Sequence, residues 1–137
     1  MRIMVDTNFL VSALFFPNPY FTEIFKHIRD NCILVLCVDV LDELLRVTKK
    51  KFPHNLQLIK TFFLKTKYEL YEIDENDFRM YPEIRDLDDK PILASAIKSG
   101  VDIFITGDPD YDDVKVIKPR IMKPRHYFDE FLKNNPK

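Results

Sequence analysis

Residues 32–37 read CILVLC, a run in which no polar side chain interrupts the apolar ones. A strand of this composition must be covered on both faces, because successive side chains point to opposite sides of a sheet. Sheets covered on both faces are built mainly from parallel strands joined by helices. This stretch therefore predicts an α/β fold, which the flanking sequence can support or exclude.

Further apolar runs separated by helical patterns occur on both sides of this stretch. Strands are expected at residues 2–5, 32–37, 68–73 and 101–107, with residues 114–117 as a candidate for a short fifth. Between them, apolar residues recur three and four positions apart, as on one face of a helix. Helices are expected at residues 18–28, 39–51, 56–63 and 91–100 and from 124 onward.

The ends of these helices carry recognisable residues. Asn18 and Pro19 form a capping and first-turn pair, and Gly100 is a plausible residue for ending the helix before the fourth strand. The alternation predicts a three-layer fold: a mainly parallel sheet of four to five strands with helices on both faces, similar to a Rossmann-like arrangement. We expect one domain over residues 1–137.

Composition excludes several classes of protein. Hydrophobic residues make up 46% of the 137 residues, but no apolar run reaches the roughly 18 residues of a membrane span. The two cysteines, Cys32 and Cys37, lack zinc-ligand spacing and are expected to be free thiols in a reducing compartment. With no secretory signal pattern, a cytoplasmic protein without membrane contact is expected. The two glycines, Gly100 and Gly107, exclude a glycine-rich phosphate loop.

Acidic residues follow the predicted strands. In parallel sheets, ligands bind beyond the carboxyl ends of the strands. Asp6 follows the first strand, Asp39 and Glu43 follow the second, and Asp108 follows the fourth. The acids that precede the helix leading into the fourth strand are Asp86, Asp88 and Asp89.

Each acid alone has a structural interpretation. Asp6 and Asp89 could cap helices, Glu43 could lie at the edge of an apolar stripe, and Asp108 could be a turn residue before proline. Gathered together, two bare carboxylates about 4 Å apart repel by roughly 4 kcal/mol at an effective dielectric near 20. Such a cluster is either splayed into water or holds a divalent cation. Ligands that are all oxygen favour Mg²⁺ or Mn²⁺.

Three stretches resemble the PIN-domain ribonucleases, and in particular the small prokaryotic VapC-like group of toxin–antitoxin systems. They are VDTNFLVSAL at the start, Glu43 within LDELLRV, and RDLDDKPILASAIKSGVDIFITGDPDY. The third is the most specific, because an acid precedes the ILASAI helix and TGD follows the next strand. The resemblance covers nearly the whole chain, with its motifs in the expected order.

The resemblance implies a set of site residues. It assigns the four acids of the catalytic and metal site to Asp6, Glu43, Asp89 and Asp108, and the supporting positions to Asn8, Ser12, Asp86 and Thr106. Asp110 and Asp112 are alternatives to Asp108 as a metal ligand. Relatives often open the Glu43 helix with Ser or Thr, whereas this chain has Cys37-Val38-Asp39, so capping is expected to fall to Asp39.

The implied activity is metal-dependent hydrolysis of phosphodiester bonds in single-stranded RNA, leaving a 3′-hydroxyl and a 5′-phosphate. Asp6 and Asp108 would bind the principal Mg²⁺ or Mn²⁺, while Glu43 and Asp89 would complete its shell, position the attacking water or recruit a second ion. Asn8 and Thr106 would orient the carboxylates. The histidines have no apparent catalytic partner and are expected at the surface: His27, His54 and His126.

The resemblance also implies partners. Toxin-like relatives are inhibited by an antitoxin and commonly form homodimers, for which Pro17, Tyr20 and Phe21 offer apolar surface unless they belong to the core. Basic residues could contact the RNA backbone or simply face solvent. These candidates are Lys49, Lys50, Lys118, Arg120, Lys123 and Arg125.

Other functions fit parts of the pattern. A response-regulator receiver domain also has an acidic metal pocket, but it pairs two acids after its first strand, where this chain has the single Asp6. A non-catalytic PIN-like module that binds RNA or protein is a second alternative, which the presence of all four acids disfavours. A solitary RNA-processing nuclease without an antitoxin is a third.

Overall fold

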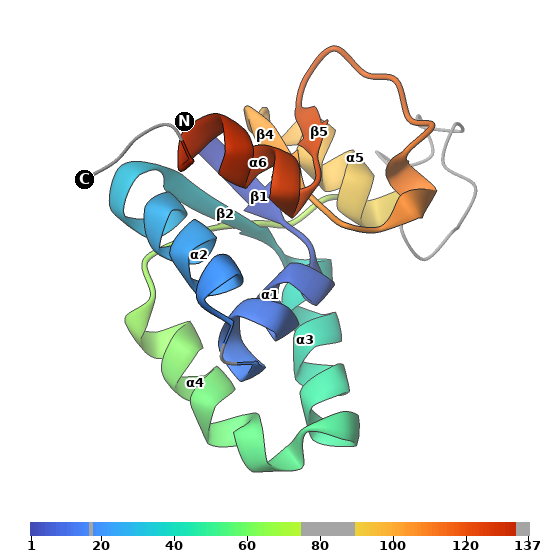
Figure 1. Cartoon of the computed structure of the whole chain (residues 1–137). Helices are drawn as coiled ribbons and strands as arrows, with labels where there is room; N and C mark the ends of the chain where they lie inside the picture. The colour runs from blue at the N-terminus through green and yellow to red at the C-terminus, as the bar shows by residue number, and fades with distance from the viewer. Residues whose placement is uncertain (17, 75–89, 134–137) are drawn as a thin grey trace.

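The computed structural model describes residues 1–16, 18–74 and 90–133. Its five strands form one parallel sheet in the order β3-β2-β1-β4-β5 (Figure 1). The strands are β1 (Arg2–Val5), β2 (Ile33–Cys37), β3 (Glu69–Tyr71), β4 (Ile103–Ile105) and β5 (Arg120–Met122). The prediction of a parallel α/β sheet is confirmed.

Six α-helices connect or follow these strands in the described ranges. They are α1 (Thr7–Phe15), α2 (Pro19–Asn31), α3 (Val38–Lys51), α4 (Leu56–Lys65), α5 (Lys90–Lys98) and α6 (Pro124–Phe131). Asn18 caps α2 by accepting a hydrogen bond from the Tyr20 N–H, and Gly100 follows α5 with a φ of 74°, as glycine at such a helix end commonly does. Both predicted helix-end residues are confirmed.

Two local predictions are wrong. Residues 114–117 do not form the fifth strand, which lies instead at Arg120–Met122, inside the basic stretch. Ile117 is fully exposed, whereas Met122 is buried against the sheet, so the strand forms where the chain can bury a side chain beside β4. The helix that carries Glu43 begins at Val38 with Cys37 as its N-cap and no side-chain capping bond, so Asp39 lies in the first turn and does not cap it.

The order of the strands determines where a ligand can bind. From β1 the chain moves through β2 to β3 in one direction, and then returns past β1 to β4 and β5. Because such connections are right-handed, the helices that join β1 to β2 lie on the opposite face of the sheet from α5, which joins β3 to β4. Helix α6 follows the last strand and returns to pack against α2. Figure 1 shows α2 and α6 together in front of the sheet. The carboxyl ends of β1 and β4 meet at this switch point, the usual ligand crevice of a parallel sheet.

The core of the molecule lies on both sides of the central strands. β1, β2 and β4 contribute side chains that are almost fully buried, including Ile3, Leu36 and Phe104. The two-sided burial expected from CILVLC is therefore present, with Ile33 the exposed exception at the start of β2. In the described part of the chain, no helix combines the length and apolar character that crossing a bilayer requires.

Candidate functional site

Asp6 lies at the carboxyl end of β1 and is only 6% exposed. One of its oxygens, Oδ1, accepts a hydrogen bond of 2.9 Å from the Phe9 N–H and so caps α1. The other, Oδ2, accepts a 2.5 Å hydrogen bond from the Thr106 hydroxyl. Asp6 therefore caps a helix, as its structural interpretation predicts, and its second oxygen faces the end of β4.

Thr106 joins the ends of three segments. Its N–H donates to the Met122 carbonyl at 3.0 Å, which continues the sheet pairing past β4 and β5. Its hydroxyl is bonded to Asp6 and also accepts from the Asp108 N–H at 3.1 Å. Since Thr106 is 2% exposed, its side chain is held in place by packing. One buried hydroxyl thus fixes the position of Asp6 relative to the backbone of Asp108.

Asp108 follows β4 and opens a short 3₁₀ turn over Pro109–Tyr111. Its Oδ1 accepts a hydrogen bond from the Asp110 N–H at 2.9 Å, so the turn interpretation also holds. Asp110 and Asp112 are exposed, and Asp112 forms an ion pair with Lys123 at 3.6 Å. Of these three acids, Asp108 is the one whose charge acts on Asp6.

Glu43 reaches the same region from α3. It is half-buried, and its nearest ion pair is a loose one of 3.9 Å with Arg46 in the following turn of the helix. Helix α3 packs against both α1 and α5, which brings its side chains to the carboxyl edge of the sheet. The charge of Glu43 also acts on Asp6.

The electrostatics of Asp6 reflect this convergence. Burial raises the pKa of Asp6 above its ordinary value, hydrogen bonds from Thr106 and Phe9 lower it in part, and the negative charges of Asp108 and Glu43 raise it further. A buried carboxylate that meets mainly other carboxylates is costly unless a cation compensates for it. The site therefore favours binding of a positive charge.

The residues present fit a hard divalent cation by donor type and by openness. Within the described ranges, no three acidic, histidine or cysteine side chains are placed together so as to hold a metal ion. Mg²⁺ commonly binds through one or two carboxylates, retains several waters and takes further oxygens from a substrate phosphate. Asp6 and Asp108, joined through Thr106, offer such an open arrangement of oxygens.

Two other predicted positions, Asp86 and Asp89, lie outside the described residues. The supporting candidates Asn8 and Ser12 are both on the first two turns of α1. They line a cavity of about 380 Å³ that also reaches Asp108, Phe21 and Pro124. The structure thus brings five of the predicted residues to one region: Asp6, Asn8, Ser12, Thr106 and Asp108, with Glu43 acting on it electrostatically.

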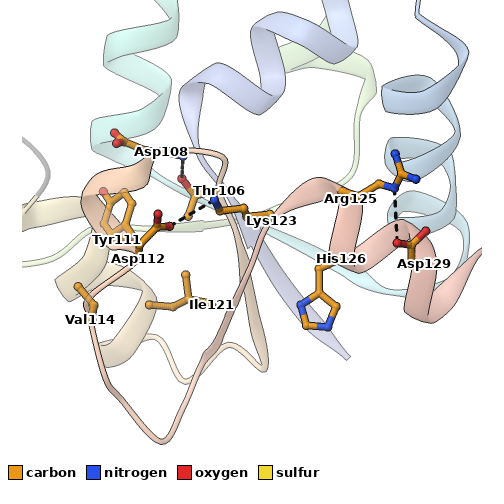
Figure 2. Close-up of a pocket in the computed structure, with 10 residues that line it drawn as sticks. All are labelled: Thr106, Asp108, Tyr111, Asp112, Val114, Ile121, Lys123, Arg125, His126 and Asp129. Carbon is orange, nitrogen blue, oxygen red and sulfur yellow. Dashed lines mark hydrogen bonds and ion pairs between the residues drawn. The ribbon is translucent and has the colours of Figure 1, made fainter.

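A second cavity, of about 540 Å³, begins at Thr106 and Asp108 and extends toward α6. Figure 2 shows Asp108, Tyr111 and Asp112 on one side of it and the start of α6 on the other, with Lys123 between them. Lys123 and Arg125 are among the basic candidates predicted from sequence. His126, which was expected only at the surface, and Asp129, which was not predicted for the site, also line this cavity. Helical spacing from Pro124 could have placed these two beside Arg125.

The predicted basic residues are divided between the two edges of the sheet. Lys123 and Arg125 line the 540 Å³ cavity at the carboxyl edge. Arg120 pairs with the start of β4, and Lys118 lies 3.5 Å from Asp102, so both are at the amino edge, away from the acidic site. The remaining pair, Lys49 and Lys50, is exposed in the last turn of α3.

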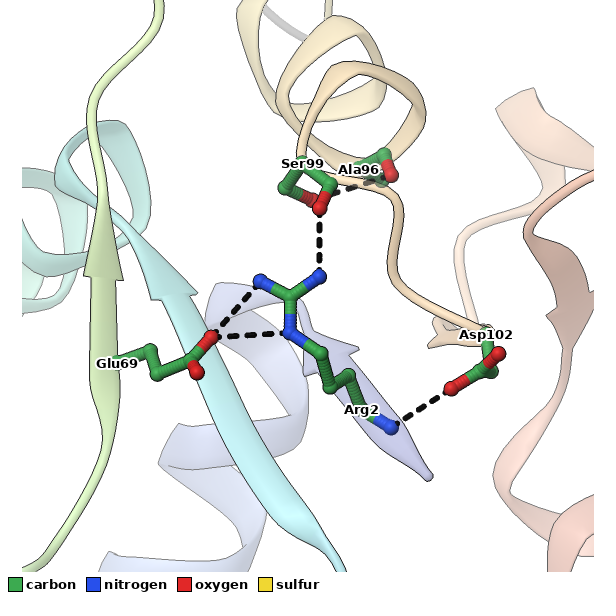
Figure 3. A network of polar contacts seen from close by, with 5 residues as sticks. All are labelled: Arg2, Glu69, Ala96, Ser99 and Asp102. Atoms are coloured by element: carbon green, nitrogen blue, oxygen red, sulfur yellow. Dashed lines mark hydrogen bonds and ion pairs between the residues drawn. The ribbon is translucent and has the colours of Figure 1, made fainter.

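The amino edge has its own polar network, drawn in Figure 3. The Arg2 guanidinium donates to Glu69 at 2.7 and 3.0 Å and to the Ser99 carbonyl at 2.6 Å. The Arg2 N–H donates to Asp102 at 2.8 Å. Arg2 thereby connects β1 to β3 and to the end of α5, which gives this edge a structural role.

One histidine differs from expectation. His54 and His126 are exposed as predicted, but His27 is half-buried, with its Nδ1 2.8 Å from the Tyr127 hydroxyl between α2 and α6. His27 precedes the buried Ile28 of α2, and its partner Tyr127 lies on α6, far along the sequence, so the local pattern does not reveal the contact. Tyr20 and Phe21 are also half-buried, packed against Phe128 and Phe9 respectively, as the core interpretation predicts.

The fold and this edge define an α/β protein with an acidic site at the switch point of a parallel sheet. The sequence model of the PIN domain matches residues 2–110 of the chain. The chain therefore belongs to the PIN-domain family, as its sequence motifs suggested.

Solved structures agree with this assignment. The chain is similar to VapBC2 from Rickettsia felis, solved with a DNA fragment from its promoter, at 19% identity and a TM-score of 0.69, covering 90% of this chain and 98% of that one. It is similar to DNA-bound VapBC from Salmonella typhimurium at 17% identity and 0.68, covering 90% and 98%.

A third similar structure is VapC20 of Mycobacterium tuberculosis, described as a toxin that cleaves the sarcin-ricin loop. It is 15% identical with a TM-score of 0.61, covering 80% of this chain and 92% of that one. No curated protein sequence matches the chain. At these identities the likeness establishes the VapC-like fold, and the chemistry must be argued from the residues of this chain.

Proposed function

We propose that this protein is a metal-dependent endoribonuclease that hydrolyses phosphodiester bonds of single-stranded RNA. The observation that carries the proposal is the buried Asp6 carboxylate, which faces the charges of Asp108 and Glu43 at the switch point of the sheet. Membership of the PIN-domain family supports it, as does the toxin activity stated for the M. tuberculosis neighbour.

Asp6 and Asp108 would hold a Mg²⁺ or Mn²⁺ ion, with Glu43 at the side of the site. Asp89 is proposed as the fourth acid, and Asp86 as its supporting residue, on the sequence motif alone. Bound there, such an ion would neutralise the phosphate, lower the pKa of an attacking water and stabilise the leaving oxygen. Asp110 is a less favoured ligand than Asp108, because its N–H donates a hydrogen bond to the Asp108 carboxylate and its own side chain is exposed.

The chain's own residues provide the order that this chemistry needs. Thr106 holds the Asp6 carboxylate in one orientation, and the Phe9 N–H holds its second oxygen. Each oxygen of Asp6 accepts one protein hydrogen bond and keeps a further lone pair for a cation or a water. Glu43 is held less tightly, since its only described ion pair is 3.9 Å long, so it is available to orient a water.

The test is cleavage of an unstructured RNA oligonucleotide in Mg²⁺ or Mn²⁺, with EDTA as the metal-free reference. Asp6→Asn and Asp89→Asn should each abolish turnover while their far-ultraviolet circular dichroism stays that of the parent. Asp102→Asn is the matched control, since it makes the same change at the amino edge. Full activity in both Asp6→Asn and Asp89→Asn would refute the mechanism.

We further propose that the nuclease is the toxin of a cytoplasmic toxin–antitoxin pair. Two of the similar structures are described as VapBC complexes on DNA, which supports an antitoxin partner. The protein encoded beside this one should then co-purify with it and suppress RNA cleavage. If the purified neighbour leaves the cleavage rate unchanged, the solitary RNA-processing nuclease is the better description.

Homodimerisation is part of the same proposal. Phe16, half exposed at the end of α1, offers an apolar contact, whereas Tyr20 and Phe21 are largely occupied by packing within the chain. Light scattering after gel filtration should give twice the monomer mass of 16.4 kDa, and Phe16→Glu should shift the protein toward monomer.

A further inference from the structure

We propose that the 540 Å³ cavity beside Asp108 is the subsite for the RNA nucleotide that flanks the scissile phosphate, with Lys123 and Arg125 as its phosphate-binding residues. The inference rests on the proposed function and specifies where its substrate lies. It starts from position: the cavity shares Thr106 and Asp108 with the acidic site, and among the described residues a second cavity lies on the other side of Asp108, so each offers a path for a strand cleaved there.

The two cavities that meet at Asp108 differ in whether cationic side chains line them. The 380 Å³ cavity is lined by Asn8, Ser12 and apolar residues, without a cationic side chain. The 540 Å³ cavity has Lys123, Arg125 and His126 along the wall formed by the start of α6, beside the carboxylates of Asp108, Asp112 and Asp129. A nucleic-acid backbone is held mainly by lysine and arginine on its phosphates. The 540 Å³ cavity, which carries the cationic side chains, is therefore the one suited to bind the phosphates of the strand.

The floor of this cavity suits a sugar or a base. Tyr111 is buried, and its ring meets Phe104 edge to face at 5.4 Å, so its position is fixed from below. Val114 and Ile121 are half-buried and complete an apolar surface. In Figure 2, Val114 and Ile121 lie below Lys123, and Tyr111 lies on the same side of the cavity as Asp108 and Asp112. The apolar floor can contact the base or sugar of a nucleotide, and Lys123 and Arg125 at the rim can contact its phosphate.

The cations of the cavity are held loosely by carboxylates. Lys123 is 3.6 Å from Asp112, and Arg125 is 3.4 Å from Asp129, in pairs whose side chains are about half exposed or more. Exposed pairs of this kind contribute about 0–1 kcal/mol, so a phosphate can displace them. Arg120 at the amino edge differs, because it forms a two-pronged pair with Glu130 at 2.7 and 2.9 Å.

The experiment compares two double variants in cleavage of oligouridylate with Mn²⁺. Lys123→Ala/Arg125→Ala should raise KM about tenfold with kcat nearly unchanged, because the lost contacts bind substrate and transition state alike. Lys118→Ala/Arg120→Ala removes the same charges from the amino edge and should leave KM unchanged. The slope of log KM against log salt should fall by about 0.7 per lost phosphate contact in the first variant alone.

A second pair of variants separates a binding role from a folding role. Lys123→Arg keeps the charge and should retain most of the affinity that is lost when Lys123 is replaced by alanine. Asp112→Asn removes the ion-pair partner of Lys123 and should lower KM by about twofold. Equal KM values for the two double variants, with an active parent, would overturn the subsite and leave the proposed nuclease standing. An inactive parent would instead refute the proposed function, and anisotropy of labelled oligouridylate would still test the subsite by the same ranking of variants.

Discussion

The two ends of the same strands are built on opposite principles. At the amino edge, the Arg2 guanidinium donates hydrogen bonds to Glu69 and to the Ser99 carbonyl. Asp102 accepts a hydrogen bond from the Arg2 N–H and forms an ion pair with Lys118. At the carboxyl edge, burial raises the pKa of Asp6, and the negative charges of Asp108 and Glu43 add to the rise. Complementary charges stabilise the first edge, whereas the second retains a charge imbalance that a ligand can compensate. The contrast supports the proposal that the carboxyl edge is the functional one.

The largest effect on activity is expected at Thr106, whose hydroxyl positions Asp6 relative to the backbone of Asp108 at the carboxyl edge. Thr106→Val removes the hydroxyl between Asp6 and Asp108 and should lower kcat/KM for RNA by about 10- to 100-fold, the usual cost of losing a group that orients metal ligands. Titration calorimetry with Mn²⁺ should show weaker binding. Thr106→Ser is the control and should remain close to the parent, and equal losses in both variants would contradict the role of the hydroxyl.

The amino edge should respond in stability and leave turnover unchanged. Arg2→Ala removes both contacts to Glu69 and the contact to the end of α5, and we expect a loss of about 1–2 kcal/mol in the free energy of unfolding in urea. The kcat of the folded protein should not change. Arg2→Lys keeps the charge but loses the planar set of guanidinium donors. Its free energy of unfolding should therefore lie between those of the parent and of Arg2→Ala. A fall in kcat with unchanged stability would invert the contrast between the edges.

The charge imbalance at Asp6 predicts a stability gain on its removal. The pKa of Asp6 is raised in the folded protein, so the stability of the metal-free protein falls as pH rises from the ordinary aspartate pKa through the folded one. Asp6→Asn retains a capping oxygen and should be more stable at neutral pH in EDTA, by on the order of 1 kcal/mol.

This gain should disappear in acid, where Asp6 is protonated in both the folded and the unfolded chain. Thermal melts of Asp6→Asn and its parent at pH 7 and near pH 3 would check both statements. A parent that is more stable than the variant at pH 7 in EDTA would show that the carboxylate is already compensated without metal.

The smallest effect is expected at Asp102, where the sign is opposite. The Arg2 N–H and then the charge of Lys118 hold the pKa of Asp102 below its ordinary value. Its contribution is therefore present above the unfolded pKa and is lost as pH falls through the folded one. Because the Asp102 side chain is 42% exposed and solvent screens its charge, Asp102→Asn should remove only a few tenths of a kcal/mol at neutral pH. Melts from pH 7 to pH 3 should show the parent losing more stability than the variant.

The sequence predicts the layered architecture well because burial on both faces leaves a direct pattern. An uninterrupted apolar run such as CILVLC is compatible with few positions other than a central strand, and Asn18-Pro19 marks a helix start by local geometry alone. The fifth strand was missed because an edge strand needs few apolar residues. Arg120, Ile121 and Met122 form a strand through pairing with β4, a contact that no local pattern encodes.

The site was predictable to the extent that residue order places strand ends together. Asp6, Thr106 and Asp108 follow β1 and β4, and a parallel sheet brings those ends to one edge. The division of the basic residues could not be foreseen, since the expected strand at 114–117 would have placed Lys118 and Arg120 beyond a carboxyl end. The shift of that strand to Arg120–Met122 moves both to the opposite edge.

Cys37, which precedes the helix that carries Glu43, gives the molecule a built-in chemical reporter. It is fully buried at the end of β2, and burial raises the pKa of its thiol to about 11. The thiolate is the form of cysteine that attacks alkylating reagents. The Cys37 sulfur is therefore protected in two ways, by lack of access and by its bound proton. Its labelling rate in the native protein therefore measures how often the centre of the sheet opens, and Cys32, which is less buried, provides the faster internal reference.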